Sequence, residues 1–128
     1  MPLTVRVLLD THLLLWALSA PARLPPAARR LIQGADVYVS AASIWEISIK
    51  AALGKLTADP NEVLAALEPA GFLGLPIAGE HAARVASLPP VHRDPFDRLL
   101  IAQALVEPMR LLTDDNVLGA YGEIVTVV

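Results

Sequence analysis

The chain has 128 residues, the length of one domain, with a formal net charge of −3, 55% hydrophobic residues and no cysteine. The absence of cysteine excludes a disulfide framework and a thiolate metal site, and it is compatible with the cytoplasmic location that we expect. No apolar stretch reaches the roughly 18 residues of a membrane-spanning helix, so we expect no membrane association. The high hydrophobic fraction predicts that a partner covers part of the apolar surface.

Short apolar runs predict five strands, which alternate with segments that have apolar residues at helical spacing. Strands are expected at 5–9, 37–39, 72–77, 110–113 and 123–127. Helices are expected at 11–18, from 25–26 to 33, at 41–53, 61–68, 80–88 and 95–106, with a short helical turn at 116–120. This alternation predicts an α/β protein whose central parallel sheet of about five strands is covered on both faces. Because no repeat or second domain is visible, we expect residues 1–128 to form a single domain.

Four acidic residues are expected to meet at one edge of this sheet. Asp10 directly follows the first strand and Asp115 follows the fourth. Asp97 lies in the first turn of the helix at 95–106, and Glu46 lies in the helix after the second strand. Ligands of open α/β sheets bind beyond the carboxyl ends of the strands, which is where these side chains are predicted to converge.

Clustered carboxylates repel one another unless a cation neutralises them, and oxygen ligands are what Mg²⁺ prefers. A metal-activated water is a suitable nucleophile for a phosphodiester, and a second metal would stabilise the leaving oxygen. Setting aside the four candidate ligands leaves nine acidic residues against ten Lys and Arg. The charge balance therefore neither excludes nor indicates RNA as the substrate.

Two of these acids also have a purely structural interpretation. Asp10 is a favoured residue for capping the helix that follows it. Glu46 matches a capping box with Ser43, or an ion pair with Lys50 one turn later. Against the capping box, the helix is expected to begin near Ser40, which places Glu46 in an apolar second turn.

The other acids occur in pairs. Asp94 is expected to cap the helix that begins at Pro95, which explains Asp94 well and Asp97 only in part. Asp114 and Asp115 are adjacent, and each is suitable as the cap of the following turn. We expect the three histidines and the two tryptophans to be structural or interface residues, although His12 is also suitable for lining the site. They are His12, His81, His92, Trp16 and Trp45.

Four segments together resemble the PIN-domain toxins of bacterial type II toxin–antitoxin systems, the VapC-like group. They are LLDTHLLLW at 8–16, SAASIWEISIKAALGKL at 40–56, HRDPFDRLLIAQA at 92–104 and LLTDDNVLGAYG at 111–122. The segments occur in the order of the family and span most of the chain. The resemblance implies a PIN-like three-layer α/β/α sandwich and a ribonuclease that hydrolyses RNA.

The resemblance also implies the roles of particular residues. The catalytic and metal-binding acids are Asp10, Glu46, Asp97 and Asp115, with Mg²⁺ as cofactor and Mn²⁺ as a substitute. The third acid of the family pattern precedes Arg and the apolar helix, which selects Asp97 over Asp94. The fourth follows Thr with one residue between, which selects Asp115, although the adjacent Asp114 leaves this choice open. Two small hydroxyl positions that support the ligands correspond to Thr11 and Thr113.

The partners that the resemblance implies are an RNA substrate, a second copy in a homodimer, and a cognate antitoxin that places a basic side chain near the acids. Two alternatives remain open: a PIN nuclease that processes RNA outside a toxin–antitoxin pair, and a non-catalytic binding module of the same fold. A phosphatase of the haloacid dehalogenase type is disfavoured, because it needs a second aspartate two residues after Asp10, where this chain has His12.

Overall fold

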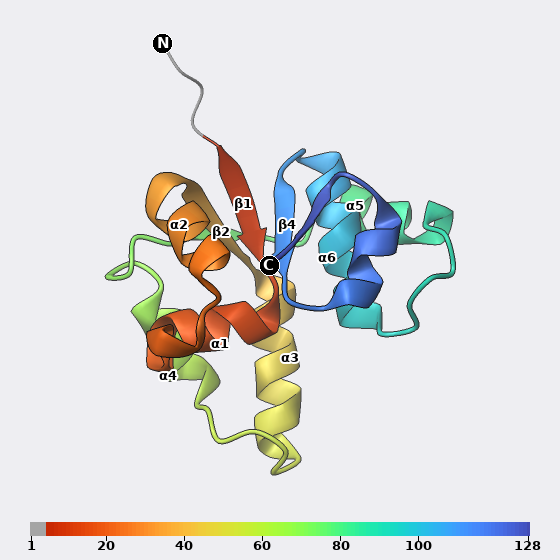
Figure 1. Cartoon of the computed structure of the whole chain (residues 1–128). Coiled ribbons are helices and arrows are strands. Elements are labelled where there is room, and N and C mark those ends of the chain that lie inside the picture. Colours follow the sequence, from red (N-terminus) through yellow and green to blue (C-terminus); the bar gives the residue numbers. More distant parts are fainter. Residues whose placement is uncertain (1–4) are drawn as a thin grey trace.

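A computed structural model describes residues 5–128 of the chain. Its centre is a five-stranded sheet in the order β3-β2-β1-β4-β5, in which every neighbouring pair is parallel. The strands are β1 (Arg6–Leu9), β2 (Asp36–Ser40), β3 (Leu73–Leu75), β4 (Arg110–Thr113) and β5 (Val125–Val127). The predicted α/β/α sandwich with a parallel sheet is confirmed (Figure 1). The expected single domain of 1–128 includes residues 1–4, which lie outside the described part.

Helices cover both faces of the sheet. They are α1 (Thr11–Ser19), α2 (Pro26–Gly34), α3 (Ala41–Ala52), α4 (Pro60–Ala66), α5 (Gly79–Arg84) and α6 (Pro95–Val106). Three 3₁₀ turns accompany them: η1 (Pro21–Arg23), η2 (Val85–Ser87) and η3 (Asn116–Tyr121). Figure 1 shows α1, α2 and α4 on one side of the sheet and α5 and α6 on the other.

Alternate residues of the strands enter two separate cores. Val7 and Leu9 of β1 pack with α1, α2 and α4, whereas Leu8 between them packs with α6 and η3. This alternation follows from the two-residue period of a strand. Because all three side chains are fully buried, each is expected to contribute about 1.5–3 kcal/mol to the stability of the fold.

Several boundaries differ from those expected. The strand predicted at 72–77 is only Leu73–Leu75, and the following Pro76 has no N–H to continue the ladder. The helix predicted at 80–88 is α-helical only over Gly79–Arg84 and then tightens into η2 before Pro89. The short turn predicted at 116–120 is a 3₁₀ turn that continues to Tyr121.

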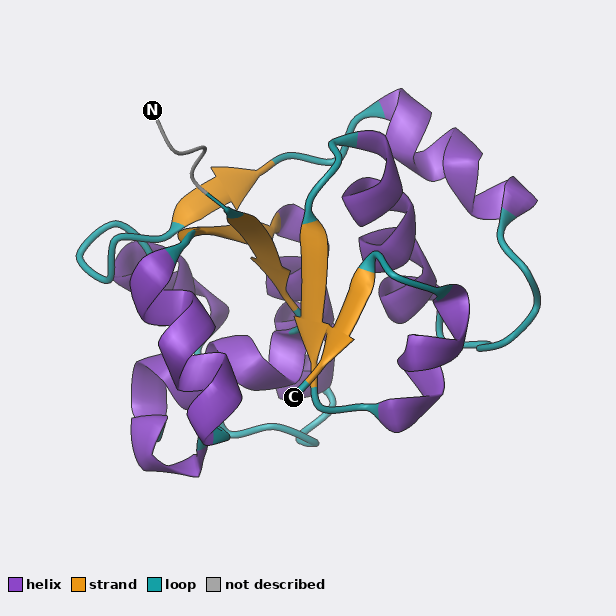
Figure 2. Cartoon of the chain, turned by 45° about the horizontal axis from the view of Figure 1, so that its top comes forward, coloured by secondary structure: helices purple, strands orange, loops and turns teal. Residues whose placement is uncertain are grey.

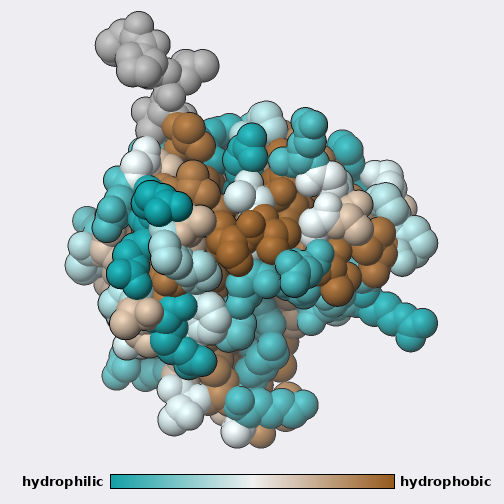
Figure 3. Space-filling model, in the orientation of Figure 1, coloured by the Kyte–Doolittle hydropathy of each residue, from teal (hydrophilic) through white to brown (hydrophobic). Residues whose placement is uncertain are grey.

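Hydrophobic side chains remain at the surface of the described chain. Figure 3 shows several hydrophobic residues gathered near the middle of the face that Figure 1 presents. On α3, Trp45, Ile49 and Leu53 are 56%, 36% and 63% exposed. None of the helices within residues 5–128 combines the length and the hydrophobicity needed to cross a bilayer.

Candidate metal centre

The carboxyl ends of the parallel strands lie at one edge of the sheet, where the heads of β1, β4 and β5 come together (Figure 2). A cavity of about 340 Å³ opens at this edge. All four predicted acids line it: Asp10, Glu46, Asp97 and Asp115. The convergence predicted from strand ends is therefore present, although these residues come from four different elements of the chain.

Asp10 is both a helix cap and a member of this cluster. It is 6% exposed, and its Oδ1 accepts a hydrogen bond from the Leu13 amide at 2.8 Å, which caps α1. Its Oδ2 accepts one from the Thr113 hydroxyl at 2.5 Å, and that hydroxyl accepts one from the Asp115 amide at 3.1 Å. Burial raises the pKa of Asp10 to about 6, although both hydrogen bonds to its carboxylate oppose the shift.

Glu46 lies in the second turn of α3. Ser40 caps this helix by accepting a hydrogen bond from the Ala42 amide, so a capping box between Ser43 and Glu46 is wrong. Glu46 Oε2 accepts a hydrogen bond from Lys50 Nζ at 2.6 Å. Its Oε1 is buried and has no hydrogen-bond partner among the described residues. A buried carboxylate oxygen without a partner is costly unless something else binds there.

Asp94 and Asp97 have different surroundings. Asp94 Oδ1 accepts hydrogen bonds from the amides of Phe96 and Asp97, so Asp94 caps α6 as predicted. Asp97 has a pKa raised to about 7, chiefly by burial and next by the charge of Asp94. The charges of Glu46 and Asp10 raise it further, because they are close enough to repel the ionised carboxylate.

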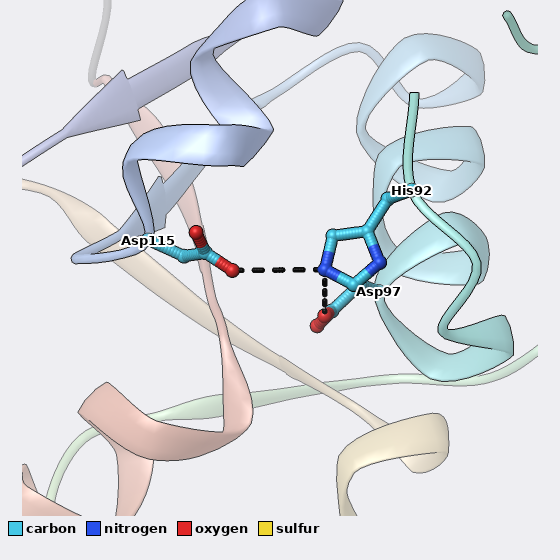
Figure 4. Close-up of side chains that lie close together, drawn as sticks. All are labelled: His92, Asp97 and Asp115. Carbon is cyan, nitrogen blue, oxygen red and sulfur yellow. Dashed lines mark ion pairs between the residues drawn. The ribbon is translucent and has the colours of Figure 1, made fainter. Parts of the chain in front are cut away.

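The adjacent aspartates after β4 point to different neighbours. Asp115 Oδ1 caps η3 through the Val117 amide at 2.9 Å, and its Oδ2 faces His92. Asp114 Oδ1 instead lies 3.9 Å from His12 Nδ1. Both aspartates line the cavity, but Asp115 is the one that points toward Asp97 across the imidazole ring of His92 (Figure 4). This geometry favours Asp115 over Asp114 as the fourth candidate ligand.

The two threonines singled out by the resemblance differ in what they contact. Thr113 links Asp10 to the backbone of Asp115, as described above. The hydroxyl of Thr11 donates to Ser43 Oγ at 2.9 Å, which joins α1 to α3. The structure thus places Thr113, rather than Thr11, in direct contact with a candidate ligand.

His92 is a residue of this cluster that the sequence-based interpretation left out. Its Nε2 lies 3.3 Å from Asp97 Oδ2 and 3.6 Å from Asp115 Oδ2 (Figure 4). His81 by contrast is 2% exposed and has hydrogen-bond partners at both ring nitrogens, in agreement with the structural role expected for it. No spacing rule indicated His92, because the segment before α6 is irregular and folds back over the helix.

The donor set suits a hard divalent cation. Its atoms are carboxylate oxygens from four elements, and one of them is the buried Glu46 Oε1 that has no described partner. Such ligands match the preference of Mg²⁺ for oxygen. The pKa values of Asp10 and Asp97 are raised chiefly by burial and further by neighbouring carboxylates, so a cation bound in the cavity would stabilise the ionised form of both groups.

A family model, that of the PIN domain, matches residues 7–124. The chain belongs to the PIN domain family. The resemblance to PIN domains is thereby confirmed, and the four acids lie within the matched region. Among curated proteins, none is significantly similar to the chain.

Solved structures share this PIN fold over nearly the whole chain. A toxin–antitoxin complex from Klebsiella pneumoniae has a TM-score of 0.65 at 17% identity, covering 94% of this chain and 96% of that chain. VapBC2 from Rickettsia felis, bound to a DNA fragment from its promoter, has a TM-score of 0.66 at 12% identity, covering 97% and 98%. FitAcB from Neisseria gonorrhoeae has a TM-score of 0.53 at 22% identity, covering 90% and 91%. At these identities the likeness establishes the fold.

Proposed function

We propose that this PIN domain is a metal-dependent endoribonuclease that hydrolyses RNA phosphodiester bonds. The observation that carries the proposal is the meeting of Asp10, Glu46, Asp97 and Asp115 in one cavity, with the buried Glu46 Oε1 left without a described partner. Membership of the PIN domain family supports the same conclusion. We assign the four acids as the catalytic and metal-binding residues, with Mg²⁺ as cofactor and Mn²⁺ as a substitute.

A bound divalent cation would supply a water of lowered pKa and would neutralise charge on the phosphate. The residues of the chain prepare the site for it. Thr113 orients Asp10 and connects it to the backbone of Asp115. Lys50 donates a hydrogen bond to Glu46 Oε2, and Glu46 Oε1 has no hydrogen-bond partner among the described residues. Lys50 and Lys55 also line the cavity, where their charges would attract the RNA backbone.

Removal of divalent metal is expected to stop cleavage. Purified protein, free of any partner, would be mixed with a labelled single-stranded or looped RNA, with and without excess EDTA. We expect no cleavage in EDTA and full recovery after Mg²⁺ or Mn²⁺ is restored. The reason is that the four acids activate a water only through a bound metal. Undiminished cleavage in excess chelator would contradict the metal mechanism.

We further propose that the protein is the toxin of a type II, VapBC-like toxin–antitoxin system, acting in the cytoplasm as a homodimer that a cognate antitoxin inhibits. Two of the similar solved structures are toxin–antitoxin or VapBC assemblies by their descriptions, and the FitAB complex has the same fold. Trp45, Ile49 and Leu53 leave a hydrophobic strip exposed on α3, beside an apolar groove of about 680 Å³ between α3, α4 and β3. Such surface is suited to being covered by partners.

Expression of the wild type alone is expected to arrest growth, whereas coexpression with the small protein encoded next to it should restore growth. The matched control is Asp10→Asn, which keeps the helix cap and removes a charge from the site. This variant should be harmless alone and should still bind the partner in a pull-down. If the wild type leaves growth unaffected while the purified enzyme cuts RNA, the protein is an RNA-processing nuclease outside a toxin–antitoxin pair. If it cuts no RNA under any metal condition, a non-catalytic binding module is the better interpretation.

A further inference from the structure

We infer that His92 acts on the proposed metal centre as a hydrogen-bond donor that positions Asp97 and Asp115, and that it is not itself a metal ligand. The inference rests on the proposed function, because it assumes that these two carboxylates bind the cation. If His92 is not a ligand, all protein ligands of the metal are oxygens, and such a site favours Mg²⁺ over ions that prefer imidazole.

Distance alone suggests the opposite assignment. His92, Asp97 and Asp115 each offer a ligand atom, and these atoms lie within 4.8 Å of one another. Imidazole nitrogen is a good ligand for transition metals such as Zn²⁺ and for other borderline ions. A site with one imidazole and two carboxylates would therefore favour such ions over Mg²⁺, which binds oxygen.

The hydrogen bond at the other ring nitrogen decides between these assignments. The amide of Asp94 donates to His92 Nδ1 at 3.0 Å. A nitrogen that accepts a hydrogen bond carries no hydrogen, so the ring hydrogen is on Nε2. Nε2 is the atom that faces Asp97 Oδ2 and Asp115 Oδ2. For Nε2 to bind a metal, the ring hydrogen would have to be on Nδ1. It would then clash with the hydrogen of the Asp94 amide, which points at the same atom.

The backbone on either side of the ring is held in place. The His92 amide donates to the Tyr121 hydroxyl at 3.0 Å, and Arg98 Nη1 donates to the His92 carbonyl at 3.3 Å. The same Arg98 nitrogen also donates to the Tyr121 hydroxyl at 3.3 Å. These contacts tie the irregular segment before α6 to both α6 and η3. His92 Nε2 is thus held facing Asp97 and Asp115, where its N–H is placed to orient both carboxylates, as outer partners commonly do for metal ligands.

His81 offers an internal reference for this assignment. Its Nδ1 accepts a hydrogen bond from the Ala78 amide at 2.9 Å, and its Nε2 lies 2.5 Å from Glu107 Oε2. At His92 too, Nδ1 accepts a hydrogen bond from a backbone amide, but Nε2 faces two carboxylates at the longer distances of 3.3 and 3.6 Å. Glu107 does not line the cavity of the four acids. Both rings should therefore carry their hydrogen on Nε2, and only the His92 ring lies beside the proposed metal ligands.

The first test is ¹⁵N NMR of the histidine side chains in the full chain, assigned with His81 and His92 variants. We expect the Nε2–H tautomer at both positions without metal, and its retention at His92 after saturation with Mg²⁺. A hydrogen on Nδ1 of His92, or loss of the Nε2 hydrogen when Mg²⁺ or Mn²⁺ is added, would overturn the inference. This measurement does not depend on cleavage.

The second test is calorimetric titration of Mg²⁺ and of Mn²⁺ into wild type, His92→Gln and His92→Ala, with thermal unfolding to show that each variant is folded. His92→Ala should lower the affinity for Mg²⁺ and for Mn²⁺ by a similar factor of about 10. Gln retains an N–H at the position of Nε2, so His92→Gln should recover most of the affinity. A loss confined to Mn²⁺ in both variants would identify His92 as a ligand. If the wild type binds neither ion, the proposed metal centre fails, while the tautomer result still tests the donor geometry.

Discussion

Asp97→Asn is expected to reduce RNA cleavage by more than about 100-fold, since the loss even of outer partners of metal ligands costs about 10- to 100-fold. The ionised form of Asp97 is disfavoured in the metal-free protein, because burial and the charges of Asp94, Glu46 and Asp10 all raise its pKa. Asn has the same shape, but it cannot supply the negative charge that would neutralise a cation. The measurement is the initial rate on a fixed RNA at saturating Mg²⁺.

Asp94→Asn is the matched control three residues earlier. Asp94 caps α6 through its Oδ1, and Asn caps a helix about as well as Asp. This variant should therefore keep most of the cleavage rate. Loss of activity in Asp94→Asn together with a normal rate in Asp97→Asn would show that the wrong acid of the DPFD segment had been assigned.

The second large effect is on the stability of the metal-free protein at different pH values. Asp10 and Asp97 have pKa values of about 6 and about 7 in the folded protein, both raised from 3.8. Because the folded state binds these protons more tightly than the unfolded chain, both groups favour folding below pH 4. This contribution is lost as the pH rises through 6 and 7. We expect the free energy of unfolding in EDTA to be lower at pH 8 than at pH 5, by on the order of a few kcal/mol.

Denaturant unfolding of wild type and Asp97→Asn at pH 5 and pH 8, in EDTA, measures this contribution. The variant cannot ionise at position 97, so it should be the more stable protein at pH 8 and should show a weaker pH dependence. Mg²⁺ should stabilise the wild type at pH 8 by binding the folded state, and it should stabilise the variant less. Equal pH dependence in the two proteins would mean that Asp97 is not buried among other charges.

Much of the fold was predictable from the sequence because the signals for its elements are local. Apolar runs, prolines at helix starts and the capping aspartate before Pro95 depend on a few neighbouring residues, and α6 has the predicted bounds. The four acids were predictable for a related reason. Parallel strands end at a common edge, so topology directs Asp10 and Asp115 there. Glu46 and Asp97 lie instead in the early turns of α3 and α6.

Tertiary packing decided what the local signals left open. Thr113 contacts Asp10 across 103 positions of the chain, and His92 reaches Asp115 only because the segment before α6 folds back against Tyr121. The choice between Asp114 and Asp115 depends on side-chain directions after β4. That Glu46 Oε1 has no partner among residues 5–128 depends on how α3 packs beside α6. The sequence by itself determined the order of the elements, the family and the acids Asp10, Glu46 and Asp97 as candidates, because short segments encode them. Which atoms meet in the cavity was decided by contacts between distant segments, which neither periodicity nor spacing specifies.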